Sequence, residues 1–335
     1  MIRRKTVCAI LAFCLGTVAV APQAAAEVSE VKVALQYGVG YLPLSVMRHD
    51  KLFEKHLKQE GLAHTTVTWA RLANGSAMND ALLSGDLNFA AGGVAPFLIM
   101  WDRTRGRDGV KAIAALCSMP MFINTNDPAI KSVRDLTSKD RIAVAGAGSS
   151  IETIVLWMEA AKLYGMDNYR HFDPMMVNLP HPAGMAALLS KKDITAQFTS
   201  PPFQYMELQH PDIHTILNSY DVTGPATFLV TWTTSTFRKE NPKVYNAFFA
   251  AQKEATDLIN EDKRAAAKIY IEESESKESV DFIDKILNDP QIRITLTPQA
   301  VKKTADFMHQ VGQLKADPSS WKVLFFPEVH DLHGS

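Results

Sequence analysis

The sequence predicts an α/β protein of two lobes, each lobe a mainly parallel sheet flanked by helices. Three observations predict this fold class. Strand-like and helix-like segments alternate along the chain, the alternation begins a second time near position 141, and the last strong strand-like segment is followed only by helix-like segments. The length of 335 residues suits about two domains of roughly 100–200 residues each.

The first α/β unit starts at residues 31–36, where apolar and polar residues alternate as in a half-buried strand. Helix 75–84 carries Met78 and Leu82 on one side and ends at Gly85, and helix 96–103 has a proline in its first turn. The unit comprises strands at 31–36, 64–69, 87–91 and 110–117, and helices at 42–50, 75–84 and 96–103.

The second unit repeats the alternation and ends in a helical tail. Helix 242–260 in that tail has Asn241 as a cap, Pro242 in its first turn and an apolar stripe that includes Val244 and Phe248. The predicted strands are 141–145, 175–179, 195–199, 214–218 and 227–234, and the predicted helices are 151–164, 183–190, 203–209, 242–260, 263–270, 279–287 and 298–312.

Two such units with a helical tail suit a chain that crosses between two lobes twice. We expect the crossings near residues 119–124 and 219–228. One lobe then holds residues 27–121 and 226–335, and the other holds residues 122–225.

The first 26 residues have the pattern of a cleaved secretory signal peptide. Basic residues at positions 3–5 precede an apolar run at 7–20, and Ala24-Ala25-Ala26 provides small residues for cleavage before Glu27. The run is shorter than the roughly 20 residues that a membrane-spanning helix needs. Lipid anchoring needs a small residue before the modified cysteine, whereas Val7 and Phe13 precede Cys8 and Cys14. We therefore expect an exported, soluble and monomeric mature protein.

Charge and cysteine content narrow the class of partner. The whole chain has a formal charge of −1, and without the three basic residues of the signal it carries 32 basic against 36 acidic side chains. A mildly acidic surface argues against nucleic-acid binding. The mature chain keeps one cysteine, Cys117, which cannot form an internal disulfide and lies in an apolar stretch typical of a buried small hydrophobe.

Loops that follow strands are the candidate ligand site, because ligands of open α/β sheets lie beyond the carboxyl ends of the strands. These loops are rich in Gly, Ser, Pro, Met and aromatic residues, and Arg71 is their one formal charge. Such residues bind a small molecule through backbone amides, hydroxyls and flat apolar faces. The candidate ligand-binding residues are Tyr37, Tyr41, Asn74, Gly92, Gly93, Met119, Ser149, Ser150, His181, Ser200, Phe203 and Thr223.

No arrangement typical of a catalytic or metal centre stands out. The glycine-rich turns at 146–148 and 38–40 fail the dinucleotide fingerprint at Ile151 and Pro43, and His210 and His214 are separated by Pro211, which disfavours a helix. The spacings that Ser/His/Asp, paired-carboxylate or Cys/His chemistry would need are missing as well. We expect no catalytic residue, no metal and no cofactor.

Ser149 and Glu152 have the spacing of a capping box at the start of helix 151–164. A helix N-terminus favours an anion, but Glu152 adds a negative charge to that same first turn. We therefore expect a ligand that is neutral, aromatic or only weakly anionic. A ligand held through Arg71 would contradict this expectation.

Four segments, in order, resemble one family. These are the Tyr-rich loop 37–43, the run Leu83-Ser84-Gly85-Asp86-Leu87-Asn88-Phe89-Ala90, the segment 130–136 with the strand 141–144, and the strand 177–180 with Ala186-Ala187-Leu188-Leu189. They resemble the periplasmic binding proteins of nitrate, sulfonate and taurine importers, with relatives that bind riboflavin or pyrimidine precursors of thiamine. The chain departs from that pattern at residues 138–141 and 191–196 and at Glu152.

The resemblance implies a type II periplasmic binding protein fold with a small-molecule ligand in the inter-lobe cleft. It also implies a periplasmic location and delivery of the ligand to an ABC permease with its ATPase in the inner membrane. Two alternatives stay open. Thiamine-pyrimidine synthases share the fold but use clustered Cys and His, and a sensory module would hand its ligand to a receptor.

Overall fold

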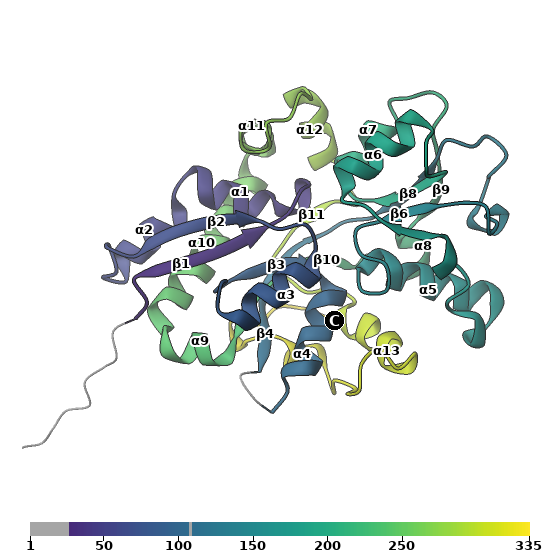
Figure 1. The fold of residues 1–335 in the computed structure, drawn as a ribbon. Coiled ribbons are helices and arrows are strands. Elements are labelled where there is room, and N and C mark those ends of the chain that lie inside the picture. Colours follow the sequence, from purple (N-terminus) through teal and green to yellow (C-terminus); the bar gives the residue numbers. More distant parts are fainter. Residues whose placement is uncertain (1–26, 107–108) are drawn as a thin grey trace, which may run out of the picture.

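The computed structural model describes residues 27–106 and 109–335, and the predicted signal peptide lies outside the described residues. Figure 1 shows two groups of helices around separate sheets, one from the start and end of the chain and one from its middle. We call them the first lobe, with strands β1–β4, β10 and β11, and the second lobe, with strands β5–β9. This two-lobe α/β architecture agrees with the predicted fold class.

The first lobe is organised around β10 (Thr227–Thr234), which lies antiparallel between β3 (Ala90–Gly93) and β4 (Val110–Ser118). The short β11 (Arg293–Ile294) adds to the edge at β4. On the other side, β1 (Glu30–Leu35) pairs in parallel with β2 (Thr66–Arg71). A bridge between Val33 and Phe89 and a 3.0 Å hydrogen bond from Ala34 N to Phe89 O join β1 to β3.

The second lobe has a five-stranded sheet in the order β7-β6-β8-β5-β9. Its strands are β5 (Phe122–Thr125), β6 (Ile142–Val144), β7 (Met176–Asn178), β8 (Ala196–Thr199) and β9 (His214–Asn218). β6 runs parallel to β7 and β8, whereas β5 runs antiparallel to β8 and β9. The sheets are thus not mainly parallel. The second-lobe sheet is mixed, because β5 runs against both of its neighbours, and the four-stranded sheet of the first lobe is antiparallel throughout, with only β1 and β2 pairing in parallel.

The two crossing segments lie side by side. Ser118 pairs with Thr227 at the end of the β4–β10 ladder. A little further along, the Met121 and Ser219 backbones are joined by a hydrogen bond of 2.8 Å, and Met121 N also donates to Ser219 Oγ at 2.8 Å. Between these two points the chain passes from one lobe to the other in a short double-stranded connection.

Helices of the first lobe pack in two groups. One group is α1 (Leu42–His49), α2 (Leu52–Gln59), α10 (Pro242–Glu261), α11 (Lys263–Ser274) and α12 (Val280–Leu287); the other is α3 (Gly75–Ser84), α4 (Val94–Thr104) and α13 (Val301–Gln310). α9 (Ser235–Glu240) connects β10 to α10. Along α10 the predicted apolar stripe is buried from Val244 to Ala255, but its last predicted member, Leu258, is 38% exposed and the neighbouring Ile259 is buried instead.

The second lobe carries α5 (Ile151–Tyr164), α6 (His181–Ser190), α7 (Phe203–Glu207) and α8 (Tyr220–Thr223). α5 packs against α4 and α13 of the first lobe, which brings its N-terminus to the boundary between the lobes (Figure 1). Among the described residues, no helix combines the length and apolar character needed to cross a membrane.

Strand β5 and helices α2, α8 and α9 were not predicted, and β5 occupies part of the segment predicted as the first crossing. Three further details differ from the predicted elements. β3 lies at Ala90–Gly93 rather than 87–91, because Gly92 and Gly93 pair with Val230 and Leu229 of β10. The tail is not wholly helical, since β11 pairs with β4. Finally, the Asn241 side chain does not cap α10.

The start of α10 is capped from elsewhere in the chain. The Glu27 carboxylate accepts hydrogen bonds from Lys243 N at 2.9 Å and Val244 N at 2.8 Å, while the Asn241 side chain accepts from Val28 N. A carboxylate at a helix N-terminus is favourable both as a hydrogen-bond acceptor and toward the helix dipole. The first described residue is thus held against the body of the first lobe.

Candidate functional site

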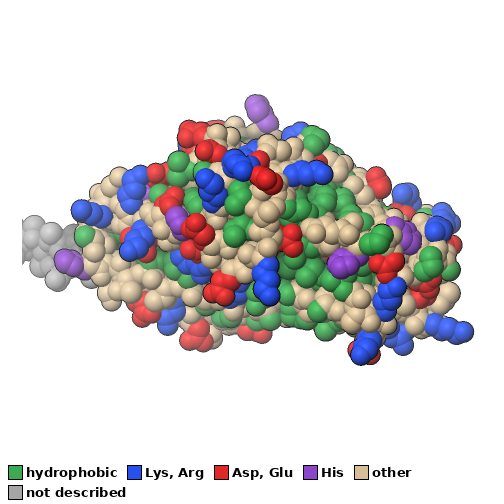
Figure 2. All heavy atoms as spheres, turned by 90° about the horizontal axis from the view of Figure 1, so that it is seen from above, with side chains coloured by type: hydrophobic (Ala, Val, Ile, Leu, Met, Phe, Trp, Pro, Cys, Tyr) green, Lys and Arg blue, Asp and Glu red, His purple; other side chains and the backbone are tan. Residues whose placement is uncertain are grey.

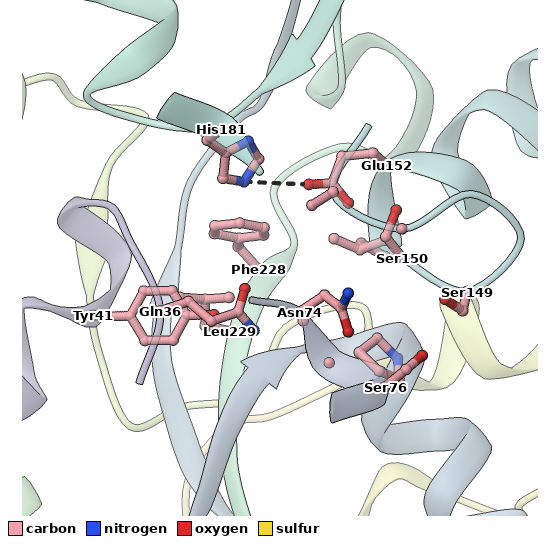
Figure 3. A pocket seen from close by; sticks show the side chains of 16 residues that line it. Gln36, Tyr41, Asn74, Ser76, Ser149, Ser150, Glu152, His181, Phe228 and Leu229 are labelled. Carbon is pink, nitrogen blue, oxygen red and sulfur yellow. Dashed lines mark ion pairs between the residues drawn. The ribbon is translucent and has the colours of Figure 1, made fainter. Parts of the chain in front are cut away.

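A small space, which we call the inner chamber, lies where the two lobes meet (Figure 3). Its volume is about 30 Å³, room for about two water molecules. A larger molecule therefore fits only if the lining residues move apart. The chamber is lined by Gln36, Tyr41, Asn74, Gly75, Ser76, Gly93, Pro96, Ala145, Gly146, Ser149, Ser150, Ile151, Glu152, His181, Phe228 and Leu229.

The first lobe contributes the ends of β1 and β3 and the start of α3. Asn74 is the N-cap of α3 and accepts a hydrogen bond from Ala77 N at 3.0 Å, so its side chain is fixed at the rim of the chamber. The next residue, Gly75, is a glycine because a Cβ at this position would lie 2.5 Å from the Pro96 side chain. The ring of Tyr41 is buried, and burial raises the pKa of its hydroxyl, which therefore stays protonated.

The second lobe contributes the turn between β6 and α5. Ser150, not Ser149, is the N-cap of α5, with its hydroxyl accepting from Thr153 N. Ser149 N donates instead to Gly146 O at 3.2 Å. The predicted capping box of Ser149 and Glu152 is therefore wrong, and the Glu152 side chain lines the chamber instead of folding back on its own helix (Figure 3).

Glu152 faces His181 across the top of the chamber in Figure 3, with 3.6 Å between Oε1 and Nε2. Both side chains are buried, at 2% and 8% exposure. His181 is held by a 2.9 Å hydrogen bond between Nδ1 and Thr199 Oγ1, and its ring stacks on Phe203 at 5.8 Å. The side chain therefore has little freedom to turn away from Glu152.

Burial lowers the pKa of His181, and the neighbouring Glu152 only partly opposes this. The imidazole is therefore neutral at pH 7, and its contact with Glu152 is not an ion pair there. Glu152 is then the one formal charge among the residues that line the chamber. Around it stand groups that both donate and accept hydrogen bonds, from Gln36, Tyr41, Asn74 and Ser149.

Half of the predicted site residues line the inner chamber. These are Tyr41, Asn74, Gly93, Ser149, Ser150 and His181. Tyr37 and Phe203 line a separate, larger pocket on the other side of Gln36, and Met119 and Thr223 line a cavity of about 10 Å³ next to Phe228. The residues predicted to face one cleft are thus divided between the chamber and the neighbouring pocket, which share Gln36, and two of them line neither space. The full predicted set is Tyr37, Tyr41, Gly92, Gly93, Ser149, Ser150, Ser200 and Phe203.

Gly92 and Ser200 line none of these three cavities, for physical reasons. Gly92 lies inside β3, where a Cβ would come within 3.0 Å of the buried ring of Trp232. Ser200 is buried beside Gly38 at a contact between the lobes, where Val39 N donates to Pro201 O at 3.0 Å. Both residues therefore hold structure together behind the chamber wall.

Several lining residues were not predicted, most importantly Glu152, Gln36 and Phe228. Glu152 carries a signal in the sequence, a carboxylate in the first turn after a strand-end loop, but its spacing from Ser149 also fits a capping box. The predicted strand 31–36 includes Gln36, whereas β1 ends at Leu35, and Phe228 lies near the start of β10, so the strand-end rule singles out neither residue. The other lining residues outside the prediction are Gly75, Ser76, Pro96, Ala145, Gly146, Ile151 and Leu229.

Two groups of residues that could carry chemistry beyond binding are the metal-ligating side chains and the cysteine. Within the described part of the chain, no group of three or more His, Cys, Asp or Glu side chains is placed to hold a metal ion. Cys117 is buried in β4, and burial raises the pKa of its thiol, which is therefore a poor nucleophile. His214 lies on β9 and its Nε2 contacts Ile130 O at 2.7 Å.

A model of the NMT1-like family matches residues 24–272. No curated protein matches the sequence.

Solved structures share the fold at low sequence identity. The alkanesulfonate-binding protein SsuA from Xanthomonas axonopodis pv. citri, bound to MOPS, is 18% identical with a TM-score of 0.67, over 87% of this chain and 96% of that one. The periplasmic nitrate-binding protein NrtA from Synechocystis PCC 6803 is 14% identical with a TM-score of 0.69, over 89% of this chain and 85% of that one. The periplasmic aliphatic sulphonate binding protein SsuA from Escherichia coli is 15% identical with a TM-score of 0.64, over 90% and 92%.

Proposed function

The chain belongs to the NMT1-like family, and from that premise we propose that it is the periplasmic solute-binding component of an ABC importer. The observation that carries this proposal is the inner chamber, a small space with convergent polar groups that is lined by residues of both lobes. A ligand there contacts both lobes at once, so its binding energy favours their closure. The alkanesulfonate- and nitrate-binding proteins with the same fold support this class of function.

The proposed working cycle follows from the topology. We assign residues 27–121 and 226–335 to one lobe and 122–225 to the other, with the paired crossing segments near Ser118 and Met121 as the hinge. Opening at the hinge admits the ligand and closing encloses it. The closed, monomeric form then delivers the ligand to a membrane permease that works with an ATPase.

The ligand is a small organic molecule, and the chamber favours a neutral heterocyclic or aromatic one over a sulfonate or nitrate. Glu152 is buried at 2% exposure, lines the space and has no cationic partner at pH 7. A buried carboxylate is costly unless it receives hydrogen bonds. An N–H donor on the ligand satisfies it, whereas an anion adds a second negative charge.

Binding without catalysis is the simplest reading of this lining. The enzyme alternative, a thiamine-pyrimidine-synthase-like activity, depends on clustered Cys and His, and the chamber lining has one His and no Cys. A sensory role uses the same chamber and differs only in the protein that receives the ligand.

A thermal-shift screen of the ligand-free protein tests the proposal. With nitrate, taurine, benzoate, cytosine and riboflavin as probes, we expect the pyrimidine to raise the melting temperature by several degrees, since saturation at 100 times Kd stabilises by about 2.7 kcal/mol. Ser149→Trp, which fills the chamber, should abolish the shift. Chemical conversion of a probe on incubation with the protein would contradict the binding function.

Export predicts a defined mature N-terminus. Intact-mass spectrometry of a periplasmic extract should find a protein that begins at Glu27, the residue whose carboxylate caps α10. Replacing Ala24 and Ala26 by leucine should leave the precursor uncleaved and membrane-associated. A membrane-bound precursor as the final form of the unaltered protein would contradict the proposed location.

A further inference from the structure

A second pocket, which we call the outer pocket, lies beside the inner chamber and is about ten times larger, at about 320 Å³ against about 30 Å³. Gln36 lines both spaces. The outer pocket is lined by Leu35, Gln36, Tyr37, Gly38, Ser45, Arg71, Pro182, Pro202, Phe203, Met206, Tyr270, Ser274, Ser276, Lys277 and Glu278. It is large enough for an organic molecule without movement of the lobes.

Three separate parts of the fold build this pocket. The ends of β1 and β2 supply Tyr37 and Arg71, the starts of α6 and α7 in the second lobe supply Pro182 and Phe203, and α11 with the loop after it supplies Tyr270 and its neighbours. Figure 2 shows the face that carries α11 and α12, with hydrophobic side chains gathered in its middle and charged side chains around them. A molecule in the pocket therefore touches both lobes.

The walls are aromatic and apolar. Phe203 and Tyr270 are buried, Tyr37 is 38% exposed, and Leu35 and Met206 also line the pocket. Burial raises the pKa of the Tyr270 hydroxyl, which therefore stays protonated and can donate. Flat apolar walls with a polar tip suit an aromatic or branched aliphatic ligand body.

Two cations stand at the edge without a carboxylate partner. The Arg71 guanidinium lies 4.8 Å from the centre of the Tyr37 ring, and neither Arg71 nor Lys277 forms an ion pair within the described part of the chain. The single carboxylate of the lining, Glu278, already accepts a hydrogen bond from Gln209 Nε2 at 3.1 Å. The outer pocket is therefore net positive, opposite in sign to the inner chamber.

We propose that the outer pocket is a second binding site, for an organic acid with an aromatic or branched aliphatic body. Its carboxylate or sulfonate pairs with Arg71 and Lys277, and its body lies among Tyr37, Phe203 and Tyr270. Because this ligand bridges the lobes, its binding favours the arrangement in which the inner chamber is closed. The outer pocket differs from the inner chamber in the sign of its net charge, in its volume and in the class of ligand that it suits.

The test uses 2-naphthoate and its uncharged amide, 2-naphthamide, as probes, with the protein labelled at its methionine methyl groups. Met206 lines the outer pocket, and Met119 and Met121 line the small cavity beside Phe228. We expect 2-naphthoate to shift the Met206 methyl resonance saturably and to bind at least tenfold more tightly than the amide. Arg71→Gln and Lys277→Gln should each weaken it about three- to tenfold.

The matched control is Arg105→Gln. Arg105 is also an exposed guanidinium over an aromatic ring, at 5.5 Å from the centre of the Trp101 ring, but it pairs with Asp102 and does not line the outer pocket. This variant should leave naphthoate binding unchanged. Three results would overturn the proposal: equal affinity for acid and amide, no effect of Arg71→Gln, or a response confined to Met119 and Met121.

Discussion

Replacing Phe89 by alanine is expected to lower the free energy of unfolding by about 3–5 kcal/mol. Phe89 is fully buried, stacks face to face on Phe248 at 4.0 Å, and meets Phe237 and Phe53 edge-on at 5.3 and 5.9 Å. These rings come from α2, α9, α10 and the segment before β3, so the cavity would open at the centre of the first lobe. Urea unfolding followed by circular dichroism measures the change.

Phe249→Ala is the matched control for that experiment. Phe249 is the neighbour of Phe248 on α10 but is only partly buried. Its truncation should lower the free energy of unfolding by clearly less than that of Phe89, because a partly exposed site can be filled by solvent and leaves no buried cavity. Equal losses in the two variants would contradict the central role of the Phe89 cluster.

Elements bounded by local signals could be predicted from the sequence. Helix α3 has the predicted bounds because Asn74 caps one end and Gly85, at φ 81°, ends the other in a left-handed conformation. Helix α5 likewise has the predicted bounds, from the turn after β6 to Gly165. In both cases the deciding interactions lie within a few residues along the chain.

Elements that depend on distant partners were missed or shifted. Strand β3 extends through Gly92 and Gly93 only because β10, more than a hundred residues later, pairs with them. Strand β11 has two residues and exists through its pairing with β4. The cap of α10 comes from Glu27, at the opposite end of the chain. Single-sequence patterns carry no information on such pairings.

The candidate site shows the same division. The rule that ligands lie beyond strand ends led to Tyr41, Gly93 and Ser149, because it depends only on chain direction. It did not separate Tyr37 and Phe203, which follow strands but line the outer pocket instead. The arrangement of the two lobes determines which of these residues line the inner chamber and which line the outer pocket. That arrangement arises only once the whole chain has folded.

Replacing Glu152 by glutamine is expected to weaken binding of a ligand with an N–H donor, such as the pyrimidine probe, by roughly tenfold to a hundredfold. The magnitude follows from the loss of one charge-assisted hydrogen bond, about 1.5–3 kcal/mol. Glutamine keeps the size of the side chain, so the chamber should keep its shape. Calorimetric titration measures the change in Kd.

The contact between Glu152 and His181 can also be tested without a ligand, through the pKa of His181. Glu152 is the group that raises the pKa of His181 against the effect of burial. In the Glu152→Gln protein the pKa of His181 should therefore fall further below its ordinary value, which an NMR titration of the ring protons detects. An unchanged titration would mean that the two side chains do not interact in solution.

Glu159→Gln is the control that distinguishes the loss of a carboxylate in the chamber from the loss of any buried carboxylate on α5. Glu159 lies on the same helix α5 and is also buried, at 6% exposure, but it pairs with Lys162 and does not line the chamber. Its substitution should leave both ligand affinity and the His181 titration unchanged. If instead Glu152→Gln tightened the binding of nitrate or taurine to a physiological affinity, the natural ligand would be an anion. In that case the buried carboxylate would act to limit affinity rather than to recognise a donor.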